Sequence, residues 1–440
     1  MSSARAQNRS IFQNNRGEAQ NTSNKLIVGN RSLAKAIYLE LKKLTSQSSE
    51  FLHSTNVRKK MDSLTVANTS FALDLFEKIR ESNKTGNVFY SPLSISSALA
   101  MVYLGAAGRT EAQMSESLHF TKADDIHTGF KKLISELNKP GVPYSLSLAN
   151  RLYGEQSYKF VEKFLHDTKT YYNAELETAD FKTNAEAARG NINKWVEKHT
   201  QEKIKDILAK GDVDSLTRLV LVNAMYFKAD WDKKFKVYYT RQFPFKLNKN
   251  NTKPVQMMRQ KAKFPLVYIP EMSCRILEMP YAGKELSMII MLPNEIEDNS
   301  TGLEKLEQNL TYKNFVEWTR PERMDNAMVE VSVPRFKLEE TYDMKKLLVS
   351  MGMVDAFDDT KCDFSHMSPS NDLVLSKVIH KSFVEVNEEG TEAAAATAAV
   401  ILCGCAFMPP EVFMADHPFL FFIKHKSTQS ILFCGRYCSP

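Results

Sequence analysis

The chain has 440 residues, of which 43% are hydrophobic and 25% are charged, a normal balance for a globular protein with a large core. Its net charge of +6 is uneven, because residues 1–60 hold eleven Lys and Arg against three Glu, and the rest therefore carries about −2. This balance excludes a strongly basic, nucleic-acid-binding face on residues 61–440. No apolar run approaches the ~20 residues that cross a bilayer, so no membrane partner is expected.

Residues 1–60 are rich in Asn, Ser, Gln and Arg, and they contain one helix-like patch, around Leu33–Leu44. We expect this extension to be poorly ordered. Three interpretations stay open: a disordered tail, an artefact of an upstream start codon, or a targeting segment, since transit peptides are also Arg-rich and poor in acids. The main domain is expected to cover residues 61–440.

From Met61 onward, helical and strand patterns alternate along the chain. Ser70–Ile79 has apolar residues at helical spacing, with Ser70 as its expected N-cap. Leu93–Leu104 is largely apolar and predicts a buried helix that begins at Ser91-Pro92. Further expected elements are strands at Leu286–Leu292 and Met328–Val333, closed by Pro293 and Pro334, and a helix over Thr341–Met351 that stops at Gly352.

An alanine-rich run lies about fifty residues before the C-terminus, between Glu388 and Ala399. Alanine favours a helix, but the flanking residues Phe383–Val386 and Val400–Leu402 favour strands. Extended, the run would separate its residues by face: Thr391, Ala393, Ala395 and Thr397 on one side, and Glu392, Ala394 and Ala396 on the other. One face is then small and uncharged. The run is either a surface helix or linker, or a segment that can enter a sheet as a strand.

Three other motifs accompany this run in a fixed order: Asn87–Ala100, Asn223–Trp231 and Phe413–Ile423. Together with the alanine-rich run they resemble the serpin family, in particular its intracellular, ovalbumin-like branch, over Met61–Pro440. The resemblance implies one mixed α/β domain with three β-sheets, eight to nine helices and an exposed reactive centre loop. It also implies a cytoplasmic protein, with nuclear entry or release without a signal peptide left open.

Nothing in the sequence points to an enzyme or a cofactor. It contains no Gly-x-Ser-x-Gly elbow, phosphate-binding glycine loop or His-Glu-x-x-His motif. Asp416-His417 could form half of a triad, but Pro418 and an apolar strand follow, which favours a structural histidine. The six cysteines do not suggest a disulfide framework, and no His/Cys cluster completes a metal site at Cys403-Gly-Cys405. This pair could instead form mixed disulfides.

The serpin resemblance implies a single-use protease inhibitor, whose target cuts a bait bond and is trapped as an acyl-enzyme while the cut loop inserts into the central sheet. It assigns a hinge to ten residues: Glu388, Glu389, Gly390, Thr391, Glu392, Ala393, Ala394, Ala395, Ala396 and Thr397. Glu388 would lie at the hinge base and pair with Arg335. Gly390 would allow the bend, and Thr391 would insert first.

The same resemblance implies a buried polar cluster beneath the sheet, through which the opening strands must pass. Its members would be Ser91, Ser94, Asn223 and His380. Trp231 would be the aromatic side chain at the top of the insertion path.

The bait residue is ambiguous because the loop is one residue longer than the family pattern. Counting from the hinge gives Gly404, whereas counting back from Ala415-Asp-His-Pro418 gives Cys405, with cleavage before Ala406. We favour Cys405, with Gly404 and then Cys403 as alternatives. A small, apolar bait residue favours elastase-like or chymotrypsin-like serine proteases, and more weakly cysteine proteases. We expect a monomer. The rival hypothesis is a non-inhibitory serpin that serves as a storage protein or chaperone.

Overall fold

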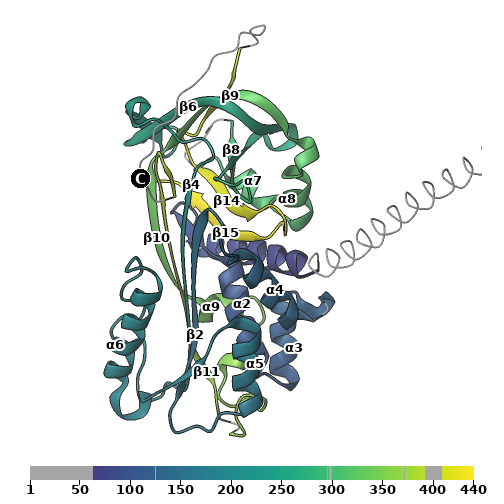
Figure 1. Cartoon of the computed structure of the whole chain (residues 1–440), viewed down its shortest axis with the longest axis vertical. Coiled ribbons are helices and arrows are strands. Elements are labelled where there is room, and N and C mark those ends of the chain that lie inside the picture. Colours follow the sequence, from purple (N-terminus) through teal and green to yellow (C-terminus); the bar gives the residue numbers. More distant parts are fainter. Residues whose placement is uncertain (1–62, 124, 295, 297–299, 371, 392–408) are drawn as a thin grey trace, which may run out of the picture. The chain divides into compact units, whose positions relative to one another are not determined.

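A six-stranded sheet and a nine-stranded sheet organise the computed structural model (Figure 1). The structure describes residues 63–440 except 124, 295, 297–299, 371 and 392–408. The described residues all belong to one unit, Lys60–Pro440. The predicted N-terminal extension therefore lies outside them.

The six-stranded sheet carries the features on which function depends. Its strands, in spatial order, are β10 (Phe336–Asp343), β11 (Leu375–Val386), β12 (Gly390–Thr391), β4 (Leu219–Asp230), β2 (Tyr144–Glu155) and β3 (Leu176–Ala179). Most of β11 pairs directly and in parallel with β4, from Leu375 opposite Leu219 to Phe383 opposite Tyr226. Only at one end does the short β12 lie between them.

The family resemblance implied three β-sheets, and two of them are joined here in one nine-stranded sheet. Its main path is β1 (Val88–Tyr90), β15 (Ile431–Tyr437), β14 (Phe419–His425), β8 (Leu286–Pro293), β7 (Cys274–Pro280), β6 (Thr252–Ile269), β9 (Asp325–Pro334) and β13 (Glu411–Met414), with β5 (Arg241–Lys246) paired to β6. The 18-residue β6 joins the two parts. Its first portion pairs with β5 and β9, and its last residues, Leu266–Ile269, pair with β7.

Nine α-helices are present in the described part of the chain, in line with the expected eight to nine. They cover residues 63–82 and α2 (Pro92–Tyr103), α3 (Gly108–Ser117), α4 (Ile126–Leu137), α5 (Glu162–Tyr172), α6 (Phe181–His199), α7 (Glu304–Gln308), α8 (Tyr312–Trp318) and α9 (Met344–Ser350). Short 3-10 turns are η1 (Phe120–Lys122), η2 (Val237–Tyr239), η3 (Pro270–Met272), η4 (Pro321–Arg323) and η5 (Asp355–Phe357). Within the described ranges, no helix has both the length and the apolar character that crossing a membrane requires.

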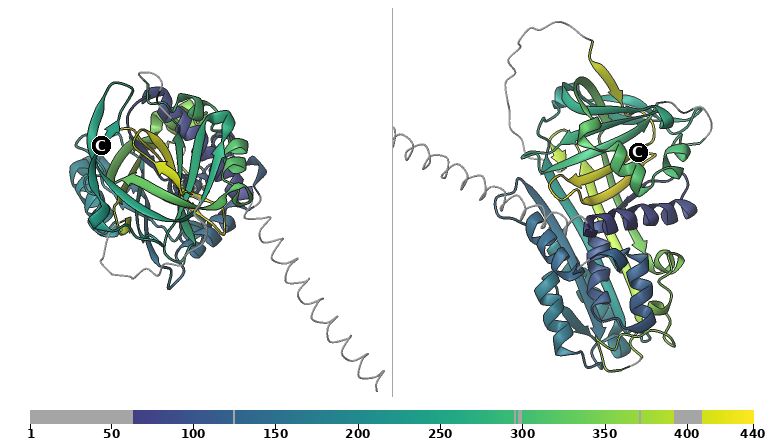
Figure 2. Two further views of the ribbon diagram at one scale, coloured as in Figure 1. Left: turned by 90° about the horizontal axis from the view of Figure 1, so that it is seen from above. Right: turned by 90° about the vertical axis from the view of Figure 1, so that its right-hand side faces the viewer.

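The six-stranded sheet separates two apolar cores. Figure 1 shows α6 alone on one side of this sheet and α2 to α5 on the other. The smaller core lies under α6, where Ile192 and Val196 pack with Val222 and Tyr226 of β4. The larger core lies on the opposite face and extends to the nine-stranded sheet, whose yellow C-terminal strands occupy the upper half of the right-hand view in Figure 2.

The predicted helices exist, but two boundaries were wrong. Ser70 is not a cap, because the helix over residues 63–82 begins earlier and already buries Leu64 and Ala67 at helical spacing. The helix predicted from Thr341 begins at Met344, since β10 runs to Asp343 and the Asp343 carboxylate caps the helix. By contrast, α2 starts after Ser91, whose hydroxyl accepts from the Ser94 amide, as predicted.

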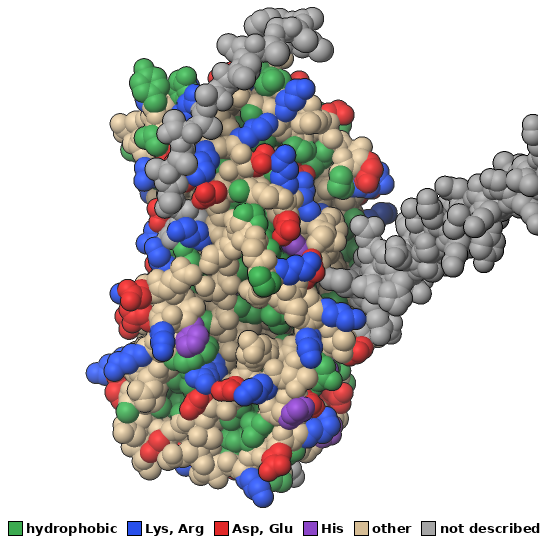
Figure 3. Space-filling model, viewed as in Figure 1, with side chains coloured by type: hydrophobic (Ala, Val, Ile, Leu, Met, Phe, Trp, Pro, Cys, Tyr) green, Lys and Arg blue, Asp and Glu red, His purple; other side chains and the backbone are tan. Residues whose placement is uncertain are grey.

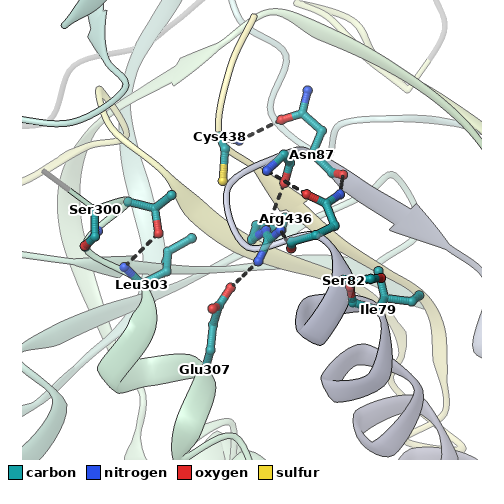
Figure 4. Close-up of polar contacts among 12 residues, drawn as sticks. Ile79, Ser82, Asn87, Ser300, Leu303, Glu307, Arg436 and Cys438 are labelled. Atoms are coloured by element: carbon teal, nitrogen blue, oxygen red, sulfur yellow. Dashed lines mark hydrogen bonds and ion pairs between the residues drawn. The ribbon is translucent and has the colours of Figure 1, made fainter. Parts of the chain in front are cut away.

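A buried ion pair ties the C-terminal strand β15 to two distant parts of the chain (Figure 4). The Arg436 Nη1 donates to Glu307 Oε1 of α7 at 2.9 Å, and both side chains are almost fully buried, at 0% and 2% exposure. Its Nε also donates to the Gly86 carbonyl at 3.0 Å. Nearby, Asn87 Oδ1 accepts from the Cys438 amide at 2.8 Å. The guanidinium charge is thus fully enclosed by acceptors.

Replacing Glu307 with Gln should therefore destabilise the protein strongly, because it leaves the buried Arg436 charge uncompensated. We expect a loss of about 3 to 5 kcal/mol in the free energy of unfolding, measured by urea denaturation. Glu81→Gln is the matched control, since Glu81 pairs with Lys78 at 2.8 Å on the surface, and it should cost less than about 1 kcal/mol. Equal losses in both variants would contradict the proposed role of this ion pair.

Candidate functional site

The central feature of the site is a place where β4 and β11 part to admit a third strand. Beyond Phe383 and Tyr226 the direct pairing ends, and Thr391 pairs with both Val386 of β11 and Ala229 of β4. Gly390 pairs with Asp230. The chain that leaves β11 therefore turns back at once and begins an antiparallel strand between its two neighbours. The sheet is already open by two residues at this end.

Gly390 is required here by close backbone approach. A Cβ atom at this position would lie 2.1 Å from the Ala229 carbonyl oxygen and 2.6 Å from the Asp230 Cα. Its φ of +156° is also one that L-residues rarely adopt. The sequence predicted a glycine that bends freely, whereas the structure shows a glycine that lets β12 contact β4.

The linker that follows β4 holds the base of the hinge by its backbone. The amide of Trp231 donates to the Glu389 carbonyl and the amide of Phe235 donates to the Glu388 carbonyl, each at 2.8 Å. The Trp231 indole Nε1 donates to the Asn387 carbonyl at 3.0 Å, and its ring stacks on Tyr281 with 4.5 Å between centroids. Trp231 is thus buried directly beside the point where β12 enters the sheet.

The predicted ion pair between Glu388 and Arg335 was wrong for this conformation. Glu388 is buried, and its Oε1 accepts from the Thr240 hydroxyl at 2.7 Å. Arg335 is exposed, because it lies between the buried residues Pro334 and Phe336 and strand alternation turns its side chain outward. No ion pair links it to Glu388 in the part of the chain that the structure describes.

The basic residue that does reach the hinge is Lys234, which the sequence did not reveal. Its Nζ lies 2.6 Å from Glu389 Oε2 and 3.0 Å from Asp230 Oδ2. The hydrogen bond that Lys234 donates to the Glu389 carboxylate raises the pKa of Lys234. This cation therefore bridges the end of β4 and the hinge base.

The four predicted cluster residues do meet beneath the sheet. Ser91, Ser94, Asn223 and His380 are all at most 1% exposed. Asn223 Nδ2 donates to the Ser94 carbonyl at 3.0 Å, and His380 Nε2 accepts from the Ser91 amide at 3.1 Å. His380 Nδ1 contacts Asn223 Oδ1, so this nitrogen carries the proton and the ring is neutral. Burial supports this state, since it lowers the pKa of His380 to about 3.

Asn150 on β2 is a further member of this cluster that the sequence did not single out. Its Nδ2 donates to the Ser97 hydroxyl at 3.1 Å, and its Oδ1 accepts from Asn223. A lone Asn in the mixed polar and apolar segment Tyr144–Glu155 is a weak signal. Only the pairing of Asn150 with Asn223 across β2 and β4 gives it meaning.

The cluster spans the boundary between the paired strands β4 and β11. His380 lies opposite Asn223 in the parallel register, and the hydrogen bond between their side chains crosses that pair. Any strand that enters between β4 and β11 must therefore break this contact. The cluster can fasten the sheet in its closed state.

The remaining predicted site residues lie outside the described residues. They are the rest of the hinge, Glu392, Ala393, Ala394, Ala395, Ala396 and Thr397, and the bait residues Gly404, Cys405 and Ala406. The structure describes the chain again from residue 409, shortly before β13, which pairs with β9. Just beyond it, His417 contacts Asp416 Oδ1 at 2.8 Å and the Pro293 carbonyl at 2.7 Å. Both ring nitrogens are used structurally, as predicted.

This arrangement is that of a serpin, and comparison with known proteins agrees. The family model described as "Serpin (serine protease inhibitor)" matches residues 66–440. The chain belongs to the serpin family.

Named relatives and solved structures extend over the same region. Leukocyte elastase inhibitor from Equus caballus is 56% identical and the one from Homo sapiens is 53% identical, each over 86% of this chain and 100% of the relative. A loop-inserted structure of a cleaved ovalbumin mutant has a TM-score of 0.77 at 35% identity, and the match covers 86% of this chain and 100% of that one.

Substituting Gly390 with Ala should expel β12 from the sheet, because the added Cβ would overlap the Ala229 carbonyl. The Asn387 amide donates to the Gly390 carbonyl at 2.9 Å, so its hydrogen exchange should accelerate by at least about tenfold. Gly190→Ala is the matched control, since a Cβ there meets nothing within 4 Å. Unchanged protection of Asn387 in Gly390→Ala would show that close approach does not constrain the hinge.

Proposed function

We propose that this chain is a suicide-type serine protease inhibitor that traps elastase-like or chymotrypsin-like enzymes as covalent acyl complexes. The observation that carries the proposal is the two-residue strand β12, which already lies between β4 and β11. Insertion of the cut loop then extends a strand that exists, and needs no new nucleation. Strand addition of this kind is the known mode of serpin loop insertion.

The register of β12 fixes where each later residue would come to lie. Thr391 is opposite Ala229 on β4 and Val386 on β11. Continuing both antiparallel registers by six residues brings Thr397 opposite Asn223 and His380. The direct pairing of β4 with β11 also sets His380 opposite Asn223. The registers of β12 with β4 and with β11 therefore agree. The Thr397 hydroxyl would lie where insertion breaks the hydrogen bond between His380 and Asn223.

In the same register, the uncharged inserting residues and the charged one would lie in different environments. Ala393 and Ala395 would lie beside Phe227 and Met225, which are buried in the larger core. Glu392 would lie beside Lys228, which is partly exposed, and would also lie beside the partly exposed Glu385. Small, uncharged residues thus meet the core, and the single carboxylate stays near water and a cation. The division of these residues between two strand faces, expected from the sequence, is therefore compatible with insertion between β4 and β11.

Insertion would release considerable free energy. About a dozen new ladder hydrogen bonds at roughly 1 kcal/mol each contribute on the order of 10 kcal/mol. This is comparable with the whole stability of a typical domain. The uncut form is then held kinetically, and the closed strand pair with its buried polar cluster provides the barrier.

The choice of target rests on the bait and on the relatives. A bait at Cys405 or Gly404 is small and uncharged, which suits a hydrophobic or shallow primary pocket. Two relatives more than 50% identical carry the name leukocyte elastase inhibitor. Activity against cysteine proteases, the monomeric state and the cytoplasmic location stay predictions.

A pair of neighbouring arginine substitutions tests the proposal. Wild-type protein mixed with elastase should give a complex that survives boiling in SDS. Thr391→Arg should abolish the complex while loop cleavage continues, because its partners Ala229 and Val386 are buried, at 3% and 0% exposure. A charge placed there would cost several kcal/mol.

Glu392→Arg adds the same side chain one position further on, and it should keep most of the trapping. The readout is the fraction of protease in the SDS-stable band at equal stoichiometry. Trapping by Thr391→Arg at the wild-type level would contradict insertion in this register. Clean cleavage of the wild-type loop without any complex would contradict the inhibitor assignment.

A further inference from the structure

An exposed cluster of apolar side chains lies on the linker between β4 and β5. In the turn η2, Val237, Tyr238 and Tyr239 are 66%, 76% and 50% exposed. Figure 3 shows hydrophobic side chains exposed at the upper left of the view, with Lys and Arg side chains around them. Three consecutive large apolar residues that are this exposed indicate a binding surface.

This turn is fixed to the base of the hinge on both sides. On one side, the Phe235 amide donates to the Glu388 carbonyl at 2.8 Å. On the other side, the Thr240 hydroxyl donates to the Glu388 carboxylate at 2.7 Å. Residues 236–239 are thus held between two contacts to one hinge residue. This turn therefore lies beside the point at which the chain enters the reactive loop.

The exposed side chains are also arranged in advance. The rings of Tyr238 and Tyr239 meet edge to face with 5.5 Å between centroids, and the Arg241 guanidinium lies 5.2 Å from the Tyr238 centroid. Arg241 Nη1 donates to the Thr240 carbonyl at 2.8 Å. Tyr and Arg are the residues that dominate protein interfaces, and side chains already ordered lose less entropy on binding.

The charge of the surface is unbalanced. Lys236 and Arg241 are both exposed, and neither forms an ion pair within the described residues. Two cations that have no acidic partner among the described residues, beside two tyrosines, suit a partner that presents apolar and acidic groups together. We call Val237, Tyr238, Tyr239 and Arg241 the tyrosine knob.

We propose that the tyrosine knob is a second docking site for the target protease, which it contacts outside the active-site cleft while the reactive loop fills that cleft. This inference rests on the proposed function. A stable interface buries about 800 Å² on each partner. Contact with the knob, which is joined to the hinge base, would add to the area that a protease buries on the reactive loop. The knob would thereby select among proteases with similar clefts, favouring those with an acidic rim.

The double variant Tyr238→Ala/Tyr239→Ala tests this directly. We expect its association rate constant with elastase or chymotrypsin to fall by at least about tenfold for the better target, with an unchanged stoichiometry of inhibition. Its affinity for the same protease with the catalytic serine replaced by alanine should fall to a similar degree. That second readout reports docking without cleavage or insertion.

Leu216→Ala is the matched control, because Leu216 is 74% exposed and precedes the start of β4, whereas the knob follows its end. The 12-residue strand places these two ends about 36 Å apart. It should leave both values at the wild-type level. Arg241→Glu should slow association and reduce its dependence on salt concentration. Unchanged rates in the tyrosine variant for both enzymes would overturn the inference. So would self-association of the wild-type chain that the tyrosine substitutions abolish, since a second copy would then be the partner.

The two proposals fail in different ways. If wild-type protein is cleaved and never traps, the inhibitor assignment fails, but the knob is still tested by kcat/KM for loop cleavage. A lower kcat/KM in the tyrosine variant than in Leu216→Ala would support docking of the protease. Equal values in both variants would reject it.

Discussion

The pairing of β4 with β11 is the constraint on which the rest of the structure depends. The two strands run in parallel, side by side, over most of their length, and a buried hydrogen bond between Asn223 and His380 fastens them. Only at the hinge end does β12 separate them. If these parallel neighbours part, an antiparallel strand from the next segment can pair with both of them. The sheet is therefore closed without that strand, and in the proposed mechanism it would be more stable with it.

The side chains around the boundary between β4 and β11 are compatible with the closed sheet and with the proposed sheet that contains the inserted strand. In the closed state His380 is neutral, with one ring nitrogen accepting from the Ser91 amide, so the cluster brings no buried charge into the sheet. In the proposed open state, small residues face the larger core and Thr397 supplies a hydroxyl at the level of the lost contact. At the hinge, Gly390 allows the backbone contact with β4, while Lys234 bridges the two chain segments that meet there. In the proposed mechanism, the features at the hinge would lower the cost of starting insertion, whereas the closed polar cluster would oppose its completion.

Much of the fold could be predicted, because long motifs identified the family and apolar periodicity located the main elements. The polar cluster was predicted as a set from the family resemblance, and three of its four residues, Ser91, Ser94 and Asn223, lie within recognisable motifs. The rest depends on tertiary contacts that no local pattern reports. Arg335 was assigned to Glu388 by family pattern, but alternation within β9 and β10 directs it to solvent. Lys234 and Asn150 were missed because only the folded sheet brings them to the hinge and the cluster. The separation into three sheets was not kept, since β6 is long enough to join two of them.

The most direct test of a strained, incomplete sheet is thermal. Cleavage of the loop once within residues 392–408 by a protease that is not trapped should allow insertion, and the product can be compared with intact protein by differential scanning calorimetry. A gain on the order of 10 kcal/mol predicts that Tm rises by roughly 10 °C or more. A cleaved protein that melts at the temperature of the intact one would contradict the account, because the sheet would then have nothing to gain from a further strand.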